Sequence, residues 1–340
     1  MSYALILKVS HTQLLCHNIR LCSKPDSMLR IVLICFCGQL FAQPGIEKSV
    51  KLFKEGKFSE ASKGFSVTKK EDADYHQARY YLGMIAFGEK KLDEAQRYFE
   101  EAIQAKGNVA DYHYWLGSTY GNIARDANVF KQGTLAPKIK NSFETAVKLD
   151  PNHLDARWGL IEYYSQAPGF MGGSWEKAEQ TARAMIKIKP AEGYRALGNV
   201  YSRQEKWGEA EQAYIAMHKA DPAYGMALAN FYIGRQNHEK AFLLYNEALE
   251  EDAENMLLNY QVGRASALSG KYLDKGEACL KKYLQYTPKQ NEPSHAGAYM
   301  RLGMIEEKRG RKAEAKKHYE KSLQLDGQMK EAKEGLSRVK

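Results

Sequence analysis

A small residue followed four positions later by an aromatic or aliphatic residue recurs along the chain after residue 45. A spacing of four places both side chains on one face of an α-helix. Eight such pairs occur, with first members 31 to 44 residues apart: Ala61 and Phe65, Ala95 and Phe99, Ile139 and Phe143, Ala178 and Ala182, Ala210 and Tyr214, Ala241 and Tyr245, Gly276 and Leu280, and Ala315 and Tyr319. The pattern predicts eight helices, each buried along one face.

A second signal precedes several of these helices and predicts that each unit is a helical hairpin. The motifs YYLG, YWLG, YQVG and MRLG end at Gly83, Gly117, Gly263 and Gly303. Small residues let two helices cross closely, and the larger residues fill the space between hairpins. Prolines at the expected helix ends complete the unit: Pro151, Pro190, Pro222 and Pro288.

The clearest unit, ALGNVYSRQEKWGEAEQAYIAMHKADP, ends at Pro222 and resembles the tetratricopeptide repeat (TPR) signature in all but its first Trp. The resemblance extends over residues 45–340. It implies an all-α fold, a right-handed superhelical solenoid of about eight TPR helix-turn-helix repeats, whose concave groove binds a protein or peptide segment. The lengthened third repeat and the segment APGFMGGSWEKAE also resemble a group of exported bacterial TPR proteins.

The three glycines in residues 166–180 do not form a phosphate loop, because no Lys follows them and the preceding segment is helical in pattern. We expect one helix to run to Gln166 and the next to begin near Ser174, which caps it. The glycines then lie in the turn between the two helices of the fourth repeat.

The TPR resemblance implies that the first helix of each repeat lines the groove. The candidate peptide-binding residues are those on its outward face: Tyr80, Tyr114, Trp158, Arg195, Asn199, Arg203, Asn230, Tyr260 and Arg264. Asn suits pairing with peptide backbone groups, Arg suits carboxylates, and aromatic rings cover side chains. Asn199 and Asn230 match Asn positions of the carboxylate clamp found in chaperone-binding TPR domains. Arg195 stands where that clamp has Lys, so the clamp is incomplete.

Composition adds little to this picture. The net charge of +9 is spread along the chain, and the basic runs read as solvated helix faces, so we expect no nucleic-acid partner. The histidines lack metal-ligand spacing, and Cys279 lies on a second helix as a packing residue. We therefore expect no metal, no cofactor and no enzyme activity.

The N-terminal region predicts export. Residues 28–42 carry one Arg, a short apolar stretch and Ala42 before a cleavage point, the form of a signal peptide, with a buried helix as the alternative. Residues 1–27 are predicted to be a non-native upstream extension, residues 43–327 the TPR array, and residues 328–340 a C-terminal capping helix. These assignments predict an exported, periplasmic protein with no membrane span in the mature chain.

The leading functional hypothesis is a non-catalytic, monomeric protein-interaction scaffold. The first alternative is a subunit or pocket-bearing part of an envelope enzyme or assembly complex, which uses inserted loops of repeats 3 and 4. End-to-end self-association through the terminal repeats is the second, and the polar last helix argues against it.

Overall fold

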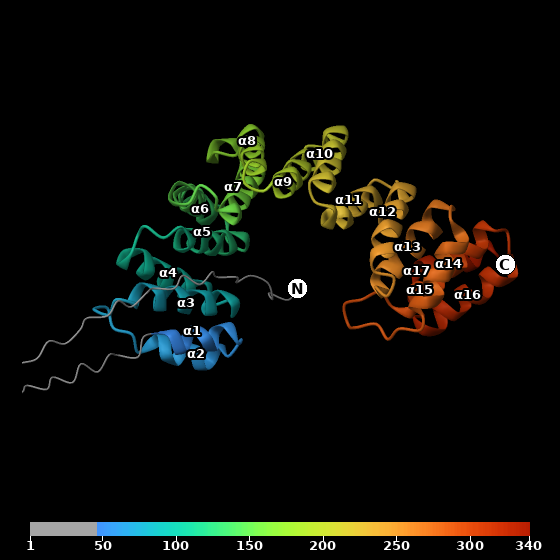
Figure 1. Cartoon of the computed structure of the whole chain (residues 1–340), viewed down its shortest axis with the longest axis horizontal. Coiled ribbons are helices and arrows are strands. Elements are labelled where there is room, and N and C mark those ends of the chain that lie inside the picture. Colours follow the sequence, from blue (N-terminus) through green and yellow to red (C-terminus); the bar gives the residue numbers. More distant parts are fainter. Residues whose placement is uncertain (1–45) are drawn as a thin grey trace, which may run out of the picture. The chain divides into compact units, whose positions relative to one another are not determined.

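The computed structural model describes residues 46–340, which belong to one compact unit. The predicted upstream extension, the signal peptide and four of the cysteines lie outside the described residues. Within residues 46–340 the secondary structure is entirely helical (Figure 1). None of the helices in that range is both long and apolar enough to cross a bilayer.

The helices follow one another with short connections. Their bounds are α1 (Glu47–Lys54), α2 (Phe58–Ser66), α3 (Tyr75–Gly88), α4 (Leu92–Ala105), α5 (Ala110–Arg125), α6 (Val129–Leu149), α7 (Leu154–Gln166), η1 (Gly169–Met171), α8 (Trp175–Ile186), α9 (Pro190–Arg203), α10 (Trp207–Ala220), η2 (Pro222–Tyr224), α11 (Gly225–Gly234), α12 (His238–Glu251), α13 (Met256–Ser269), α14 (Leu273–Tyr283), α15 (His295–Lys308), α16 (Lys312–Leu325) and α17 (Lys330–Arg338).

Consecutive helices pack as pairs, from α1 with α2 to α15 with α16. This arrangement confirms the prediction of an all-α solenoid built from about eight helix-turn-helix repeats. Some first helices of successive repeats also contact one another. The contacting pairs are α3 with α5, α5 with α7, α7 with α9, and α13 with α15. We call α3, α5, α7, α9, α11, α13 and α15 the first-helix row.

The small residues of the signature lie where the two helices of a pair approach most closely. A Cβ atom at Gly83 would lie 2.6 Å from the ring of Phe99, and one at Gly198 would lie 2.8 Å from the ring of Tyr214. Both distances are too short for a side chain. The predicted role of these glycines in helix crossing is therefore confirmed.

The regular repeats join their two helices through a tight turn with one residue in the left-handed region. That residue is Gly56, Lys90, Glu205, Gln236 or Gly310, with φ between 58° and 77°. Only the two glycines adopt this conformation without steric cost. The same turn thus recurs where the sequence offers no glycine.

The third and fourth repeats depart from this turn in different ways. The extra residues of the third repeat extend α6 to 21 residues, so the expectation of an inserted loop there was wrong. Leu135 is buried with Leu116 and Tyr120, which holds the added turns against α5. In the fourth repeat α7 ends at Gln166 as predicted. The Ser174 hydroxyl accepts a hydrogen bond from the Lys177 amide at 3.2 Å and caps α8.

The last helix, α17, packs on α15 and α16. Its Ala332 is fully buried, and a Cβ atom at Gly335 would lie 2.4 Å from the ring of Tyr319. Most of its other side chains face solvent. This one-sided burial is what a capping helix requires.

Candidate functional site

The candidate site is the surface of the first-helix row from α3 to α15. The sequence analysis placed its nine residues on the outward face of the first helices, between the packing Gly and Tyr positions. Of the nine candidate residues, Arg203 and Asn230 are exposed and most of the others are half-buried. The structure also adds partners that the sequence pattern did not show.

A cluster around Glu192 joins α7, α9 and η2. The Glu192 carboxylate accepts hydrogen bonds from Arg195 at 2.6 Å, from the Trp158 indole at 3.3 Å and from the Tyr224 hydroxyl at 2.5 Å. The Arg195 guanidinium also lies 4.7 Å from the centre of the Trp158 ring. Two candidate residues, Trp158 and Arg195, are thus brought together by Glu192, which the sequence analysis missed.

Burial alone would raise the pKa of Glu192, but the hydrogen bonds from Tyr224 and Arg195 outweigh it and hold the pKa below its ordinary value. The carboxylate therefore stays ionised and orients the indole and the guanidinium. A signal was present in the sequence, since Glu192 precedes Arg195 by three residues on one helix face.

The same two helices, α7 and α9, enclose a small hollow of about 20 Å³. Its lining includes Trp158, Asn199 and Ser165, and it is edged by an ion pair between Arg203 and Glu162 at 2.8 Å. The Ser165 hydroxyl is buried and has no hydrogen-bond partner in the described part of the chain. A hollow of this size has room for one water molecule, which would satisfy the buried hydroxyl.

Two asparagines at one register position are held in the same way. The Tyr214 hydroxyl donates to Oδ1 of Asn199 at 2.6 Å, and the Tyr245 hydroxyl donates to Oδ1 of Asn230 at 2.9 Å. Each tyrosine comes from the second helix of the same repeat. Among residues 46–340 neither Asn Nδ2 atom has a hydrogen-bond partner, so both amides keep donors for a ligand.

Arg264 occupies the same register position on α13, and its charge is not balanced nearby. Its guanidinium donates to Gln261 at 3.4 Å, and Arg301 on α15 contacts the Met304 sulfur at 3.1 Å. Neither arginine forms an ion pair within the described residues, in contrast to Arg195 and Arg203. Burial and the charges of these two arginines lower the pKa of His238. The α13–α15 end of the row is therefore cationic.

The aromatic candidates lie deeper than predicted. The ring of Tyr80 packs 5.0 Å from the ring of Tyr112, and the ring of Tyr114 packs 5.1 Å from the ring of His153. One side of Tyr80 and one side of Tyr114 are therefore buried in the protein. Tyr260 is only 8% exposed, and its ring packs 5.2 Å from that of Tyr283. The expectation that Tyr260 is available to a ligand was wrong, because the Tyr283 ring of α14 packs against its ring.

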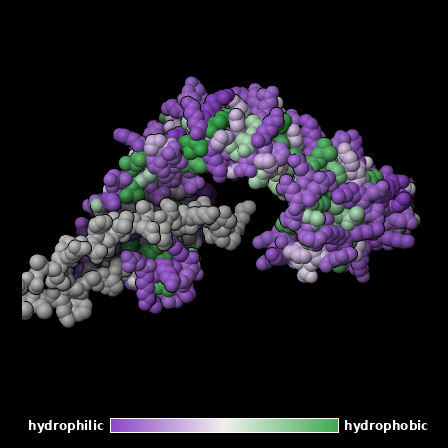
Figure 2. Space-filling view, in the orientation of Figure 1, coloured by the Kyte–Doolittle hydropathy of each residue, from purple (hydrophilic) through white to green (hydrophobic). Residues whose placement is uncertain are grey.

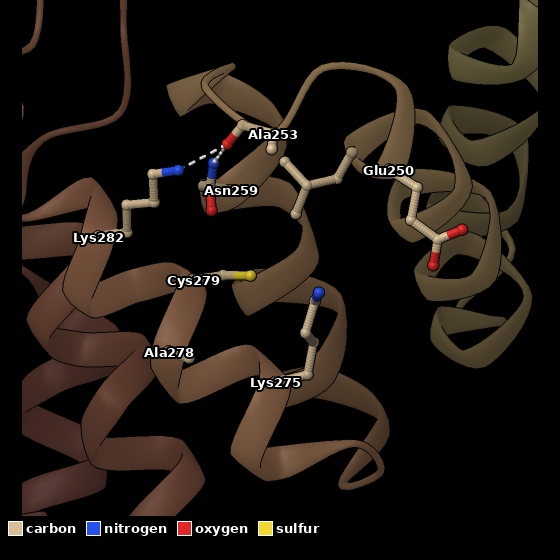
Figure 3. A pocket seen from close by; sticks show the side chains of 8 residues that line it. Glu250, Ala253, Asn259, Lys275, Ala278, Cys279 and Lys282 are labelled. Atoms are coloured by element: carbon tan, nitrogen blue, oxygen red, sulfur yellow. Dashed lines mark hydrogen bonds between the residues drawn. The ribbon is translucent and has the colours of Figure 1, made fainter.

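A larger cavity lies away from the candidate site, between α12, α13 and α14 (Figure 3). It has a volume of about 370 Å³, and Cys279, Asn259 and Lys282 line it. Lys282 is engaged by the Ala253 carbonyl and Glu254, and burial raises the pKa of the Cys279 thiol. A thiol with a raised pKa is a poor nucleophile, and Cys279 is a buried packing residue as predicted.

Metal chemistry finds no support in the described part of the chain, where no group of three His, Cys, Asp or Glu side chains is placed to hold an ion. The candidate residues are hydrogen-bond donors, three arginines and aromatic rings, which are groups that protein interfaces use.

Comparisons with known proteins agree with this fold. Models of the tetratricopeptide repeat match residues 51–110, 195–255 and 296–328. Protein O-mannosyl-transferase TMTC3 of Homo sapiens is 25% identical over 262 residues, which are 74% of this chain and 28% of that protein. Superkiller complex protein 3 of Homo sapiens is 22% identical, over 71% of this chain and 18% of that protein. The chain thus spans less than a third of the length of the curated relatives it matches first.

Solved structures of similar proteins include the C-terminal part of a TPR repeat-containing protein from Cytophaga hutchinsonii. It is 16% identical with a TM-score of 0.48, and the match covers 86% of this chain and 99% of that one. YrrB, described as a TPR protein with an unusual peptide-binding site, is 14% identical with a TM-score of 0.39, over 70% of this chain and 97% of that one. The chain therefore carries tetratricopeptide repeats in the three matched segments, and helix pairs of the same kind continue between them.

Proposed function

We propose that the protein is a non-catalytic scaffold that binds an extended peptide segment of another protein along the first-helix row. The observation that carries the proposal is the shared register of Asn199, Asn230 and Arg264 on three successive first helices. Each of the three has hydrogen-bond donors that no described residue uses.

The three residues follow one another along the row, one on each first helix. The helices that carry them, α9, α11 and α13, pack mainly on second helices and not on each other, so an extended peptide, which rises about 3.3 Å per residue, spans several residues between one donor and the next. The Asn amides suit backbone carbonyls, which recur along a peptide whatever its side chains are.

The charges along the row predict the direction in which the peptide binds. At the α7–α9 end the two arginines are neutralised by Glu162 and Glu192, whereas Arg264 and Arg301 on α13 and α15 are not. An unpaired guanidinium favours a carboxylate ligand. We therefore orient the peptide with its acidic part on α13–α15 and its neutral part on α9.

The role and place of the protein form part of the same proposal. The mannosyl-transferase name belongs to proteins of which this chain matches less than a third, and the site described above offers binding groups only. The predicted signal peptide supports a function in the bacterial envelope, in the periplasm. We further propose that the protein is a monomer and has no nucleic-acid partner.

In-cell photo-crosslinking tests the proposal. A photo-reactive residue replaces Met226, which is exposed on α11 beside the Asn row, and a control replaces Gln212, exposed on the second helix α10. We expect a discrete adduct from position 226 that position 212 does not give, and loss of that adduct in the double variant Asn199→Ala/Asn230→Ala. Equal labelling from both positions would show that the first-helix row is not the binding surface.

The second candidate function, a role in an envelope enzyme or assembly complex, is favoured by one observation. The lengthened α6 and the Gly-rich turn of the fourth repeat contact each other, so the two irregular segments form one surface. A crosslink from Phe170 with none from Met226 would favour that function over peptide binding.

A further inference from the structure

The two irregular segments of the repeat array meet at the start of α6 and at η1. A Cβ atom at Gly133 would lie 3.7 Å from the Met171 side chain. The turn is held in place, because the Tyr163 hydroxyl donates to the Met171 carbonyl and the Ser174 amide donates to the Tyr164 carbonyl at 2.8 Å. The surface they share is therefore built on fixed backbone.

Two phenylalanines project from this surface. Phe130 is 88% exposed at the start of α6, and Phe170 is 86% exposed in η1. Phe130 lies three residues before Gly133, on the same face of α6, and Phe170 adjoins Met171. The two rings therefore project from neighbouring points. Figure 2 shows hydrophobic surface over α6 and α7 among hydrophilic neighbours.

Basic residues lie beside the two rings. Lys131, Lys138 and Lys140 lie on α6, while Asp126, Glu144, Glu162 and Glu176 border the two segments. The stem of Lys140 reaches the turn itself, since its Cδ lies 4.0 Å from a Cβ atom placed at Gly172. Projecting aromatic rings with lysines beside them suit an apolar layer covered by negative groups.

We propose that Phe130 and Phe170 insert into the interface of an anionic lipid membrane, with Lys131 and Lys140 on the lipid headgroups. Area favours a membrane over a protein partner. Two aromatic side chains supply about 400 Å², whereas a stable protein interface needs about 800 Å² from each partner. A lipid interface needs no matching shape, so two rings and a few cations suffice for reversible binding. The proposal is independent of peptide binding on the first-helix row.

Vesicle titration with a local probe tests the proposal on the full chain. An environment-sensitive fluorescent residue is placed at Phe170, or at Leu243, which is 51% exposed on α12 and serves as the control. The vesicles contain phosphatidylcholine either alone or mixed with phosphatidylglycerol. We expect a blue shift at position 170 with the mixed vesicles only, and no shift at position 243. Each probe reports only the surroundings of its own position, so membrane binding through residues 1–45 would not produce the shift at position 170.

Variants then test the two contributions. Phe130→Ser, combined with the probe at 170, should weaken vesicle affinity about tenfold because one of the two inserted rings is lost. Lys131→Gln/Lys140→Gln should weaken it several-fold and reduce its dependence on salt. A Val67→Ser variant, which removes a 76% exposed apolar residue directly after α2, should leave the vesicle affinity unchanged.

Three results would overturn the proposal: no shift at position 170 with either vesicle, the same shift at position 243, or unchanged affinity in the Phe130→Ser variant. A discrete protein adduct from a photo-reactive residue at 170 in cells, without vesicle binding, would also overturn it and assign this surface to a protein partner. Both phenylalanines are exposed, so the variants are expected to fold normally.

Discussion

At the scale of single residues, the contact between Gly83 and Phe99 explains why the repeat needs a small residue in its first helix. A Cβ atom would lie 2.6 Å from a ring that is fully buried and cannot move aside. We predict that Gly83→Ala lowers the free energy of unfolding by about 1–3 kcal/mol, the usual cost of overpacking. Urea denaturation measures it.

The control for this variant is Gly121→Ala in α5, where no atom lies within 4 Å of the added Cβ. Alanine has the higher helix propensity, so this change should leave the free energy of unfolding unchanged or raise it by up to about 1 kcal/mol. Similar losses in the two variants would contradict the ring contact as the reason for the glycine at position 83.

The lowered pKa of Glu192 predicts how the stability of the protein depends on pH. Its pKa is held below the ordinary value of 4.5 in the folded protein, so its contribution to stability is complete above that value. The contribution is lost as the pH falls through the lower, folded pKa. Glu192→Gln should therefore lower stability at pH 7 and weaken the dependence of stability on pH below about pH 4.5.

Unfolding free energies of the wild type and Glu192→Gln at pH 7 and in the acid range test this. Glu209→Gln, on an exposed side chain in the first turn of α10, is the control and should behave as the wild type. A parallel pH dependence in wild type and Glu192→Gln would contradict the account of the Glu192 cluster.

The sequence was sufficient for residues whose role depends on their own helix pair. Gly83, Gly198 and Cys279 lie where the repeat register predicted. Tyr260 was misplaced because its burial depends on Tyr283 of the next helix and on Gly297 two helices on, where an added Cβ would lie 3.1 Å from the Tyr260 hydroxyl. Such contacts require the packing of three helices, which register alone does not specify.

At the scale of helices, the join between α7 and α8 shows how local signals fix an element boundary. The Ser174 hydroxyl accepts a hydrogen bond from the Lys177 amide. It thereby satisfies one of the free backbone N–H donors at the start of α8. Ser174→Ala should lower the free energy of unfolding by about 1 kcal/mol, and Ser174→Asp should retain most of it. Equal losses in both variants would show that the cap is not what stabilises this boundary.

The start of α6 shows the limit of those local signals. The sequence indicated only that the third repeat is longer, and the segment contains Pro137, which normally disfavours a helix interior. Burial of Leu135 against Leu116 and Tyr120 nevertheless keeps the added turns helical. Tertiary packing decided the element, and a single sequence does not reveal that packing.

At the scale of the whole molecule, a repeat array is stable only if its last pair is covered. Tyr319 is fully buried between α15, α16 and α17, and Arg338 of α17 pairs with Glu307 at 2.6 Å. Removal of residues 328–340 should lower the melting temperature and cause self-association, because the Tyr319 surface becomes exposed. Light scattering over a range of concentrations measures the association.

Arg338→Ala is the control for this truncation, since it removes only a partly exposed ion pair and should change stability by less than about 1 kcal/mol. The wild type and Arg338→Ala should remain monomeric at all concentrations. A truncated chain that is also monomeric and equally stable would show that α17 is not a cap.

The central claim is that Asn199 and Asn230, held by Tyr214 and Tyr245, donate to an extended peptide on the first-helix row. The most direct test is the affinity of the peptide segment captured from position 226, titrated against the wild type and Asn199→Ala/Asn230→Ala. A matched double variant on second helices, Asn141→Ala/Asn246→Ala, controls for the loss of two amides. The account predicts at least about a tenfold loss of affinity in the first variant, since each lost hydrogen bond costs about 1 kcal/mol, and none in the second. Equal affinity in all three proteins would contradict it.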